Sequence, residues 1–192
     1  MAIVNGYATL VDLKARLGIT GTGNDTVLEQ VIEAASRQVD GWCGRAFASG
    51  NGTRVLTADN ANLLILPDDL HEITEFATDR DDDFLYETIW PVNELSLMPY
   101  PGPYSIIRPR HGYSFPTQPH AIQVTGSWGY GANIPAAIRE ATLLQAARLY
   151  KRADAPFGIA GSADHGQLET ISRVDPDVKE LLAPYTRFLG VV

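Results

Sequence analysis

The spacing of apolar residues predicts two helices within the first fifty residues. The shorter one spans the stretch LVDLKARL, with Thr9 and Asp12 placed as a capping pair at its start and Gly18 as a natural C-terminal stop. In the longer one, from Asp25 to Trp42, apolar residues recur every three or four positions and charged residues occupy the opposite side. This second helix is therefore expected to bury one face.

Between Asn51 and Asn133 the pattern changes to short runs of β-branched and aromatic residues, separated by Asp, Asn, Pro and Gly. The runs are TRVLTA, NLLIL, HEITEFAT, FLYETI, SIIRPR and AIQVTGSW. They predict a meander of about six short strands.

Helical spacing returns after the strands. Pro135 stands where a first helical residue belongs, and an alanine-rich helix continues to Tyr150. Asp175 and Pro176 form the cap and first turn of a last helix, which Pro184 bends or ends.

The stretch DAPFGIAGSADHGQ, between these two helices, is rich in glycine and has no periodicity. It predicts a mobile loop that can order on binding, followed by a short strand within LETISRV. The residues assigned to this flexible assembly loop are Pro156, Phe157, Gly158 and Gly161.

Together the patterns predict an α+β protein, in which a helical bundle of about four helices carries an antiparallel β-rich insertion. Residues 1–50 form the N-terminal helical part and residues 51–132 the insertion. Residues 133–192 supply two further helices that complete one bundle with the first part.

Charge narrows the range of functions. The 192 residues have a net charge of -8 and a pI of about 4.9, which removes the attraction to phosphate that tight DNA binders use. The excess acid lies between residues 51 and 132, with 11 Asp and Glu against 4 Arg. Arg148, Lys151 and Arg152 are basic, but three charges at a helix end more often complement the helix dipole than contact DNA.

The apolar runs are all shorter than the roughly 20 residues that a membrane helix needs, and the start of the chain lacks a secretory pattern. We therefore expect a cytosolic origin and no membrane contact. A single cysteine, Cys43, excludes an intramolecular disulfide and is expected to be a small buried apolar residue.

A glycine cluster, Gly126, Gly129 and Gly131, lies between the last strand and the alanine-rich helix, where a phosphate-binding loop would also begin. The order is G-x-x-G-x-G, no Gly-Lys-Ser/Thr follows, and Trp128 and Tyr130 would crowd a phosphate. We expect instead that the glycines permit positive φ at a sharp corner and that the two aromatic residues pack on the helical bundle.

Patterns for catalysis or metal binding are incomplete. Asp79, Asp81 and Asp83 alternate as in a calcium loop, but Phe84 replaces the turning glycine and Trp90 the bidentate glutamate, which favours a solvated hairpin tip. The 4 histidines show neither the i, i+4 pairing of zinc proteases nor a companion nucleophile. We therefore assign no catalytic residue, no metal site and no cofactor.

The two ends of the chain together resemble one protein family. The stretches that carry the resemblance are YATLVDLKARLGI and LEQVIEAASRQVDGWCGRAF at the start, and VTGSWGY, IPAAIREATLLQAARLYKRADAPFGIAG and VDPDVKELLAPYTR at the end. In this order they are similar to the head-to-tail connectors, also called adaptors or head-completion proteins, of long-tailed phages, with relatives in prophages and gene transfer agents. The β-rich middle looks like a larger insertion than compact members carry.

The resemblance implies a structural virion protein and no catalysis. Such adaptors assemble in the host bacterial cytoplasm into a ring, usually a dodecamer, beneath the portal protein, although the isolated chain can stay monomeric. The next tail-proximal connector or stopper protein binds the lower face of the ring. Duplex DNA passes through the channel without specific binding, which an acidic chain permits.

Contact residues are expected where helices offer packing faces and where apolar residues lack an evident core. The hypothesised ring interface consists of Ala141, Leu144, Ala147, Arg148, Val31 and Ala35. The hypothesised portal-binding segment consists of Tyr185, Arg187, Phe188, Leu189, Val191 and Val192. The alternative for this segment is that it folds back and completes the core of its own bundle.

Two other function classes stay open from the residues alone. A hydrolase that uses acidic residues of the middle region would need carboxylates that converge in a pocket, and strand spacing cannot show this convergence. The second alternative is a β-rich ligand-binding module carried on helices.

Overall fold

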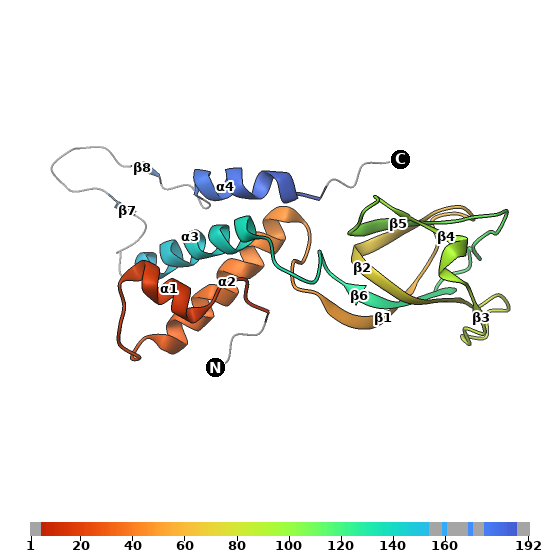
Figure 1. Cartoon of the computed structure of the whole chain (residues 1–192), viewed down its shortest axis with the longest axis horizontal. Coiled ribbons are helices and arrows are strands. Elements are labelled where there is room, and N and C mark those ends of the chain that lie inside the picture. The colour runs from red at the N-terminus through yellow and green to blue at the C-terminus, as the bar shows by residue number, and fades with distance from the viewer. Residues whose placement is uncertain (1–4, 154–158, 161–168, 171–174, 188–192) are drawn as a thin grey trace. The chain divides into compact units, whose positions relative to one another are not determined.

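The computed structural model describes residues 5–153, 159–160, 169–170 and 175–187 (Figure 1). The chain divides into two compact units. The helical unit consists of Met1–Gly44 and Ile134–Val192, and the β unit consists of Arg45–Asn133. The expected α+β class, with a β-rich insertion between helices, is confirmed.

The helices begin and end at residues whose chemistry marks helix ends. They are α1 (Leu10–Leu17), α2 (Asp25–Cys43), α3 (Ala136–Ala153), α4 (Pro176–Leu182) and a final 3₁₀ turn, η3 (Ala183–Tyr185). The Thr9 side chain caps α1 by accepting the Asp12 N–H, and Gly18 ends this helix in the left-handed region. Gly44 ends α2 in the same way, with φ of 64°.

The helical unit buries one face of each helix around small side chains. Its core cluster consists of Ala8, Leu13, Leu28, Ile32, Ala35, Leu143 and Ala146. Three ion pairs join the elements around this core: Lys14 with Asp25, Arg16 with Glu140, and Arg148 with Asp175. The alanines let α2 and α3 approach closely, as the alanine-rich sequence indicates.

Two short strands, β7 (Ile159–Ala160) and β8 (Glu169–Thr170), pair in antiparallel fashion between α3 and α4. The second lies within the stretch expected to contain a strand.

The β unit contains a six-stranded antiparallel sheet. Its strands are β1 (Gly50–Leu56), β2 (Leu64–Thr78), β3 (Thr88–Ile89), β4 (Leu95–Met98), β5 (Tyr104–Pro109) and β6 (Ile122–Trp128), with a 3₁₀ turn, η1 (Val92–Glu94), before β4. The order is β1-β6-β2-β5-β4, with β3 paired to β2. The expectation of a meander is wrong. In a meander each strand lies beside its neighbour in sequence, whereas here the last strand, β6, lies between β1 and β2.

The expected strands NLLIL and HEITEFAT are a single strand, β2, of 15 residues. β2 pairs with β5 over its first half and with β6 over its second half, and the register shifts between Ile65 and Leu70, the interval that contains Pro67. A proline cannot donate to a ladder, so it interrupts the register there and does not end the strand. The short strand β4 was not expected from the sequence pattern.

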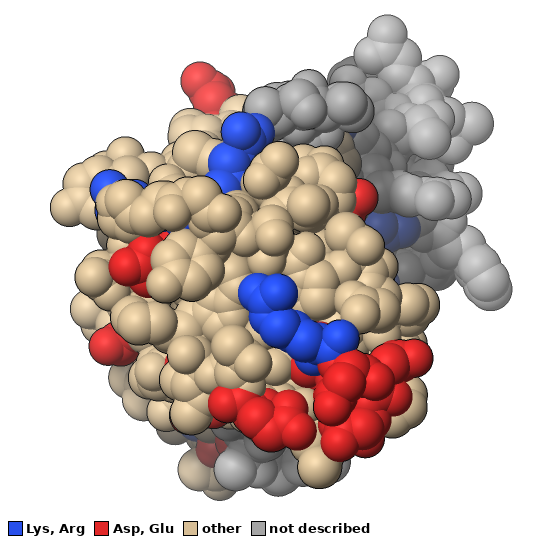
Figure 2. Space-filling view, turned by 90° about the vertical axis from the view of Figure 1, so that its right-hand side faces the viewer, with Lys and Arg blue, Asp and Glu red and all other residues tan. Residues whose placement is uncertain are grey.

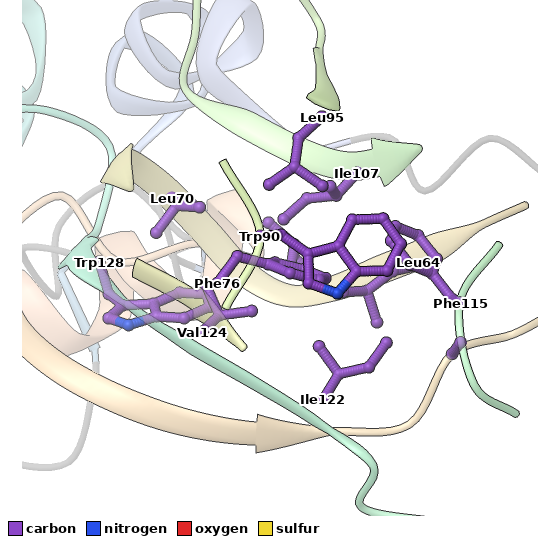
Figure 3. Close-up of a cluster of buried hydrophobic side chains, with 12 residues drawn as sticks. Leu64, Leu70, Phe76, Trp90, Leu95, Ile107, Phe115, Ile122, Val124 and Trp128 are labelled. Carbon is purple, nitrogen blue, oxygen red and sulfur yellow. The ribbon is translucent and has the colours of Figure 1, made fainter. Parts of the chain in front are cut away.

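The core of the β unit is built from large side chains (Figure 3). Phe76, Trp90 and Phe115 lie against one another with ring centroids 5.4 to 5.5 Å apart. The Trp90 indole N–H donates to the Thr78 hydroxyl, so its polar atom is satisfied inside the core. Trp128 belongs to this cluster too.

Trp128 and Tyr130 were expected to pack on the helical bundle, and the contacts described for both are with residues of the β unit. The Trp128 indole N–H donates to the Gly52 carbonyl at 2.9 Å, and the Arg54 guanidinium lies 4.1 Å from its ring centroid. Tyr130 lies against Phe47, with ring centroids 5.3 Å apart. Trp128 is the last residue of β6, so its position in the sheet brings its side chain into the core of the β unit.

Candidate functional site

The C-terminal helix α4 is held on α2 and α3 by a few side chains. Val178 and Leu182 are its buried residues. Asp175 caps α4 by accepting the Asp177 N–H, and its carboxylate lies 3.8 Å from the Arg148 guanidinium. These contacts of α4 determine the position of Tyr185, where the predicted portal-binding segment begins.

Two residues of the portal-binding hypothesis, Tyr185 and Arg187, lie within the described part of the chain, and both are half-buried. The Arg187 N–H donates to the Cys43 carbonyl at 2.7 Å, which ties the end of the described chain to the end of α2. Cys43 itself is buried, as expected. Arg187, the last residue that the structure describes, therefore lies beside the C-terminal end of α2.

A small crevice of about 10 Å³ lies beneath α4 and is lined by Gln38, Val39, Trp42, Gln145, Val178 and Leu182. The Gln145 amide N–H donates to the Gln38 side chain at 2.7 Å, and its oxygen is buried without a hydrogen-bond partner among the described residues. A space of this size has room for about one water molecule. The surface on which α4 packs therefore contains both apolar and polar side chains.

The six residues of the ring-interface hypothesis differ in exposure. Ala35 and Ala141 are fully buried within the helical unit and have no surface to offer a neighbouring subunit. Leu144, Ala147, Arg148 and Val31 are half-buried. Val31 and Ala147 pack at the margin of the helical core. The ring interface stays a prediction, and its available surface lies on these four residues.

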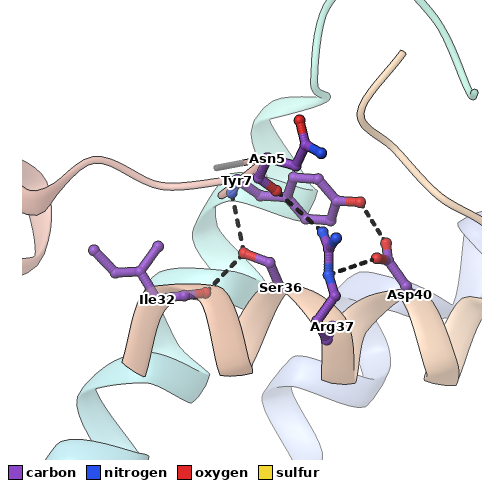
Figure 4. A network of polar contacts seen from close by, with 6 residues as sticks. All are labelled: Asn5, Tyr7, Ile32, Ser36, Arg37 and Asp40. Carbon is purple, nitrogen blue, oxygen red and sulfur yellow. Dashed lines mark hydrogen bonds and ion pairs between the residues drawn. The ribbon is translucent and has the colours of Figure 1, made fainter. Parts of the chain in front are cut away.

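A polar network ties the N-terminal segment to α2 (Figure 4). Tyr7 is buried, its hydroxyl donates to the Asp40 carboxylate, and its N–H donates to the Ser36 hydroxyl at 3.0 Å. Arg37 bridges the same carboxylate, at 3.1 Å, and the Asn5 carbonyl, at 3.0 Å. The sequence analysis did not identify this network. Its partners are about thirty positions apart along the chain, and no local sequence pattern indicates that they meet.

The glycine corner is a site of close backbone approach. Gly129 has φ of 121°, and a Cβ on it would lie less than 3.0 Å from the Ala48 carbonyl oxygen. A Cβ on Gly126 would likewise lie less than 3.0 Å from the Glu72 carbonyl oxygen of β2. The expected positive φ is therefore found at Gly129 alone. Gly126 lies within β6 and lacks a positive φ, and Gly131 has neither a positive φ nor a close neighbour, so the expectation is wrong for these two glycines. Glycine is needed at positions 126 and 129 because neighbouring backbone atoms leave no room for a side chain. This structural role agrees with the interpretation in which the glycines do not bind phosphate.

The charged loop that follows β2, together with β3, is here named the tip and comprises residues 79–89. Its organising residue is Asp79, which is buried although a solvated group was expected. One carboxylate oxygen accepts the N–H groups of Asp81 and Asp82, at 3.2 and 2.9 Å, and the other accepts that of Phe84 at 2.8 Å. Burial alone raises the pKa of Asp79, but these backbone donors outweigh it and hold the pKa below its usual value.

The carboxylates of Asp79, Asp81 and Asp83 come within 4.8 Å of one another. Both Asp79 oxygens already accept backbone hydrogen bonds, and the other two side chains are exposed. The arrangement explains the conformation of the loop without an ion. Nearby, burial and then the Asp79 charge raise the pKa of Tyr86, whose hydroxyl donates to the His120 carbonyl.

The remaining predicted contact residues lie outside the described residues. They are Phe188, Leu189, Val191 and Val192 of the portal-binding segment, and Pro156, Phe157, Gly158 and Gly161 of the assembly loop. Among the described residues, no helix combines the length and apolarity that a bilayer crossing requires.

Comparison with known families confirms the resemblance. Residues 7–78, which cover α1, α2, β1 and β2, match the family model of phage gp6-like head-tail connector proteins. The match includes both N-terminal stretches that carry the resemblance. A search of curated proteins gives no match.

Solved structures with the same fold come from gene transfer agent (GTA) particles. One, described as the neck of an empty GTA particle computed with C6 symmetry, is 20% identical with a TM-score of 0.64, and the alignment covers 100% of this chain and 96% of that chain. A chain of the virion of a native GTA particle gives the same values. A third, the neck of a native GTA particle computed with C12 symmetry, is 18% identical with a TM-score of 0.62 and the same coverage.

The two comparisons are complementary. The family match rests on sequence and covers the N-terminal helices and the first two strands. The structural matches extend over the whole chain, so the β unit and the C-terminal helices share the fold of those neck proteins.

Proposed function

We propose that this chain is a head-to-tail adaptor of a phage or phage-like particle, which forms a ring under the portal and links the DNA-filled capsid to the tail. The observation that carries the proposal is the match of residues 7–78 to head-tail connectors, joined to a fold shared over the full chain with GTA neck proteins. The ring is heterologous and closes by rotation. The symmetries of those particles, C6 and C12, are compatible with a dodecamer.

The proposed partners are further copies of the chain, the portal protein and a tail-proximal connector or stopper protein. Duplex DNA passes through the channel, and the net charge of -8 disfavours its retention. The protein is not an enzyme and works in the virion after assembly in the bacterial cytoplasm. The ring uses the half-buried surface of α2 and α3, where Val31 and Ala147 lie.

The portal contact is assigned to the C-terminal segment from Tyr185 to Val192. Tyr185 and Arg187 are already tied to the helical unit, whereas burying one large apolar side chain of the remaining residues would contribute roughly 1.5 to 3 kcal/mol. Two truncations separate docking from folding. A chain that ends at Arg187 keeps the bond to Cys43, and a chain that ends at Pro184 loses it.

We expect the chain that ends at Arg187 to keep its melting temperature and to lose attachment to portal-bearing capsids. The chain that ends at Pro184 should lose attachment and also melt at a lower temperature. Calorimetry and sedimentation of capsids with bound adaptor measure the two effects. Normal attachment by both truncated chains would remove the portal contact from this segment.

Ring formation is tested with the full chain, alone and mixed with portal protein, by size-exclusion chromatography with light scattering and by negative-stain imaging. We expect rings at least in the presence of portal. A chain that stays monomeric and does not bind the portal protein would contradict the adaptor function. It would favour the alternative functions, a hydrolase or a ligand-binding module.

A further inference from the structure

The tip displays large apolar side chains to solvent. Phe84 is 64%, Leu85 59% and Ile89 64% exposed, all within six positions of the chain. Single exposed apolar residues are ordinary on protein surfaces, but a group on one hairpin indicates a contact surface.

The backbone of the tip is held in one conformation. Besides the three N–H groups bound by Asp79, the Leu85 N–H donates to the Asp83 carboxylate at 2.8 Å, and the Tyr86 hydroxyl donates to the His120 carbonyl at 2.7 Å. A loop that is already ordered loses little conformational entropy when it binds. The backbone of the tip therefore already holds the exposed side chains in place before a partner binds.

Part of this backbone is strained. Asp82 and Phe84 both have φ of 65°, in the left-handed region that a bulky aromatic residue rarely adopts. The Asp79 carboxylate holds this conformation because it accepts the N–H of both residues. Strain of this kind persists where the surrounding structure fixes it, and it is concentrated at binding sites.

Acidic side chains outnumber basic ones around the apolar group. Asp81, Asp82, Asp83 and Glu87 are exposed, and in the described part of the chain none of them belongs to an ion pair. The neighbouring Arg80 lies over the Trp90 ring, 6.0 Å from its centroid. Figure 2 views the end at which β3 lies in Figure 1. Acidic side chains gather there at one edge of the face, next to a few Lys and Arg side chains, and most of the remaining face is uncharged.

We propose that the tip is a docking surface for a second protein, whose contact face is apolar and bordered by Lys and Arg. Phe84 and Leu85 pack on the apolar part, and the carboxylates of Asp81, Asp82 and Asp83 meet its basic border. Nucleic acid and anionic membranes are repelled by the same charges. The β unit of another copy is equally acidic, so tips do not pair with each other.

The proposal goes beyond the adaptor function, because it assigns to the purified chain a property that needs neither ring nor portal. The probe is a fluorescein-labelled amphipathic helical peptide made of Leu and Lys, with Leu on one face, and binding is followed by fluorescence anisotropy. A peptide with Glu in place of Lys is the charge control.

Two variants of the tip are compared with two matched variants of the same unit. Phe84→Ser combined with Leu85→Ser removes the apolar group, and the triple change of Asp81, Asp82 and Asp83 to Asn removes the charge. The controls are Glu72→Gln with Glu75→Gln, two exposed acids of β2, and Tyr100→Ser, which removes an aromatic side chain that is 86% exposed.

We expect the dissociation constant to rise about tenfold in each tip variant and less than about twofold in the controls, with unchanged melting temperatures. Added salt should weaken binding of the parent chain and should have little effect on the Asn variant. Absence of binding by the parent chain, equal binding of the Glu peptide, or equal losses in tip and control variants would each overturn the proposal.

A photo-crosslinking residue at position 84 then identifies the partner in assembled particles. The expected product joins the chain to a different protein, at a segment that contains Lys or Arg. A product with another copy of the chain, or no product at position 84, would overturn the proposal. If assembled particles do not contain the chain, the adaptor function is refuted. The peptide measurement alone then decides whether the tip is a docking surface.

Discussion

The helical unit and the β unit form their interiors from different kinds of side chain. In the helical unit, Ala35 and Ala146 allow helices to approach, and medium-sized residues such as Ile32 fill the remaining space. In the β unit, Phe76, Trp90 and Phe115 pack against one another in the centre with tilted and edge-on rings. Small residues make the helical interior sensitive to added volume or charge, whereas the sheet is sensitive where two backbones come close.

The two units also differ in how they use charge. Cations and anions of the helical unit meet in pairs, such as Lys14 with Asp25 and Arg148 with Asp175. The β unit keeps an excess of acid, and the carboxylates at its tip lie in solvent. Ion pairs occur in the β unit as well, such as Arg45 with Asp69 and Arg54 with Asp68, so the two units differ in the excess of exposed acid at the tip.

The largest expected effect tests the helical interior. Ala141→Glu places a carboxylate at a fully buried position and should lower the free energy of unfolding by at least about 3 kcal/mol. Ala147→Glu, at a half-buried position, should cost about 1 kcal/mol or less and should reduce ring formation instead. Denaturant titration and light scattering measure the two effects. A stable Ala141→Glu chain that fails only in assembly would place Ala141 in the ring interface after all.

The next effect tests the close approach of β6 to β2. Gly126→Ala should lower the free energy of unfolding by about 2 to 4 kcal/mol, because its Cβ would overlap the Glu72 carbonyl. The matched control is Gly52→Ala, since Gly52 pairs with Gly126 and a Cβ there meets nothing within 4 Å. Equal denaturation midpoints for the two variants would show that the strands can separate freely.

The corner after β6 should respond less strongly. Gly129→Ala introduces strain at φ of 121° and contact with the Ala48 carbonyl, so a loss of about 1 to 3 kcal/mol is expected. Gly131→Ala should change the stability by less than about 0.5 kcal/mol. Thermal unfolding of both variants tests this difference, and an equal loss would mean that both glycines are needed for the corner.

The polar network of the N-terminal segment gives a smaller effect. Tyr7→Phe removes the hydroxyl that donates to Asp40 and should lower the free energy of unfolding by about 1 to 2 kcal/mol. Tyr100→Phe, at an exposed position, is the control. Hydrogen exchange should show faster exchange at the Tyr7 N–H in the first variant only. Unchanged exchange there would mean that the backbone bond to Ser36 suffices to hold the segment.

The smallest effect is local and depends on pH. The folded-state pKa of Asp79 lies below the ordinary value of 3.8, so its charge stabilises the tip above that value and the contribution is lost as pH falls through the folded-state pKa. Hydrogen exchange at the Phe84 N–H should therefore show protection near neutral pH that decreases on acidification below about 3.8, and Asp79→Asn should remove this dependence. Protection that persists in strong acid would contradict the role of the carboxylate.

The candidate surfaces were predictable only in part. The sequence identifies the alanine-rich face and the apolar C-terminus as unusual, but it cannot tell that Ala141 faces inward while Ala147 lies at the margin. It marks the three aspartates of the tip, yet the burial of Asp79 follows from backbone donors that only the folded hairpin brings together. The exposure of Phe84 and Leu85 had no signal in the pattern, since apolar residues in a strand-like run are expected to be buried.

The sequence by itself determined both ends of α1, because the caps Thr9 and Gly18 act on backbone groups within four residues. It also determined the change from helical to strand periodicity and the acidity of the middle region. Only the tertiary structure decided the order of the strands, the continuity of β2 through Pro67 and the need for glycine at position 126. These features depend on pairing between residues far apart along the chain, where the energy of a contact exists only once both partners are in place.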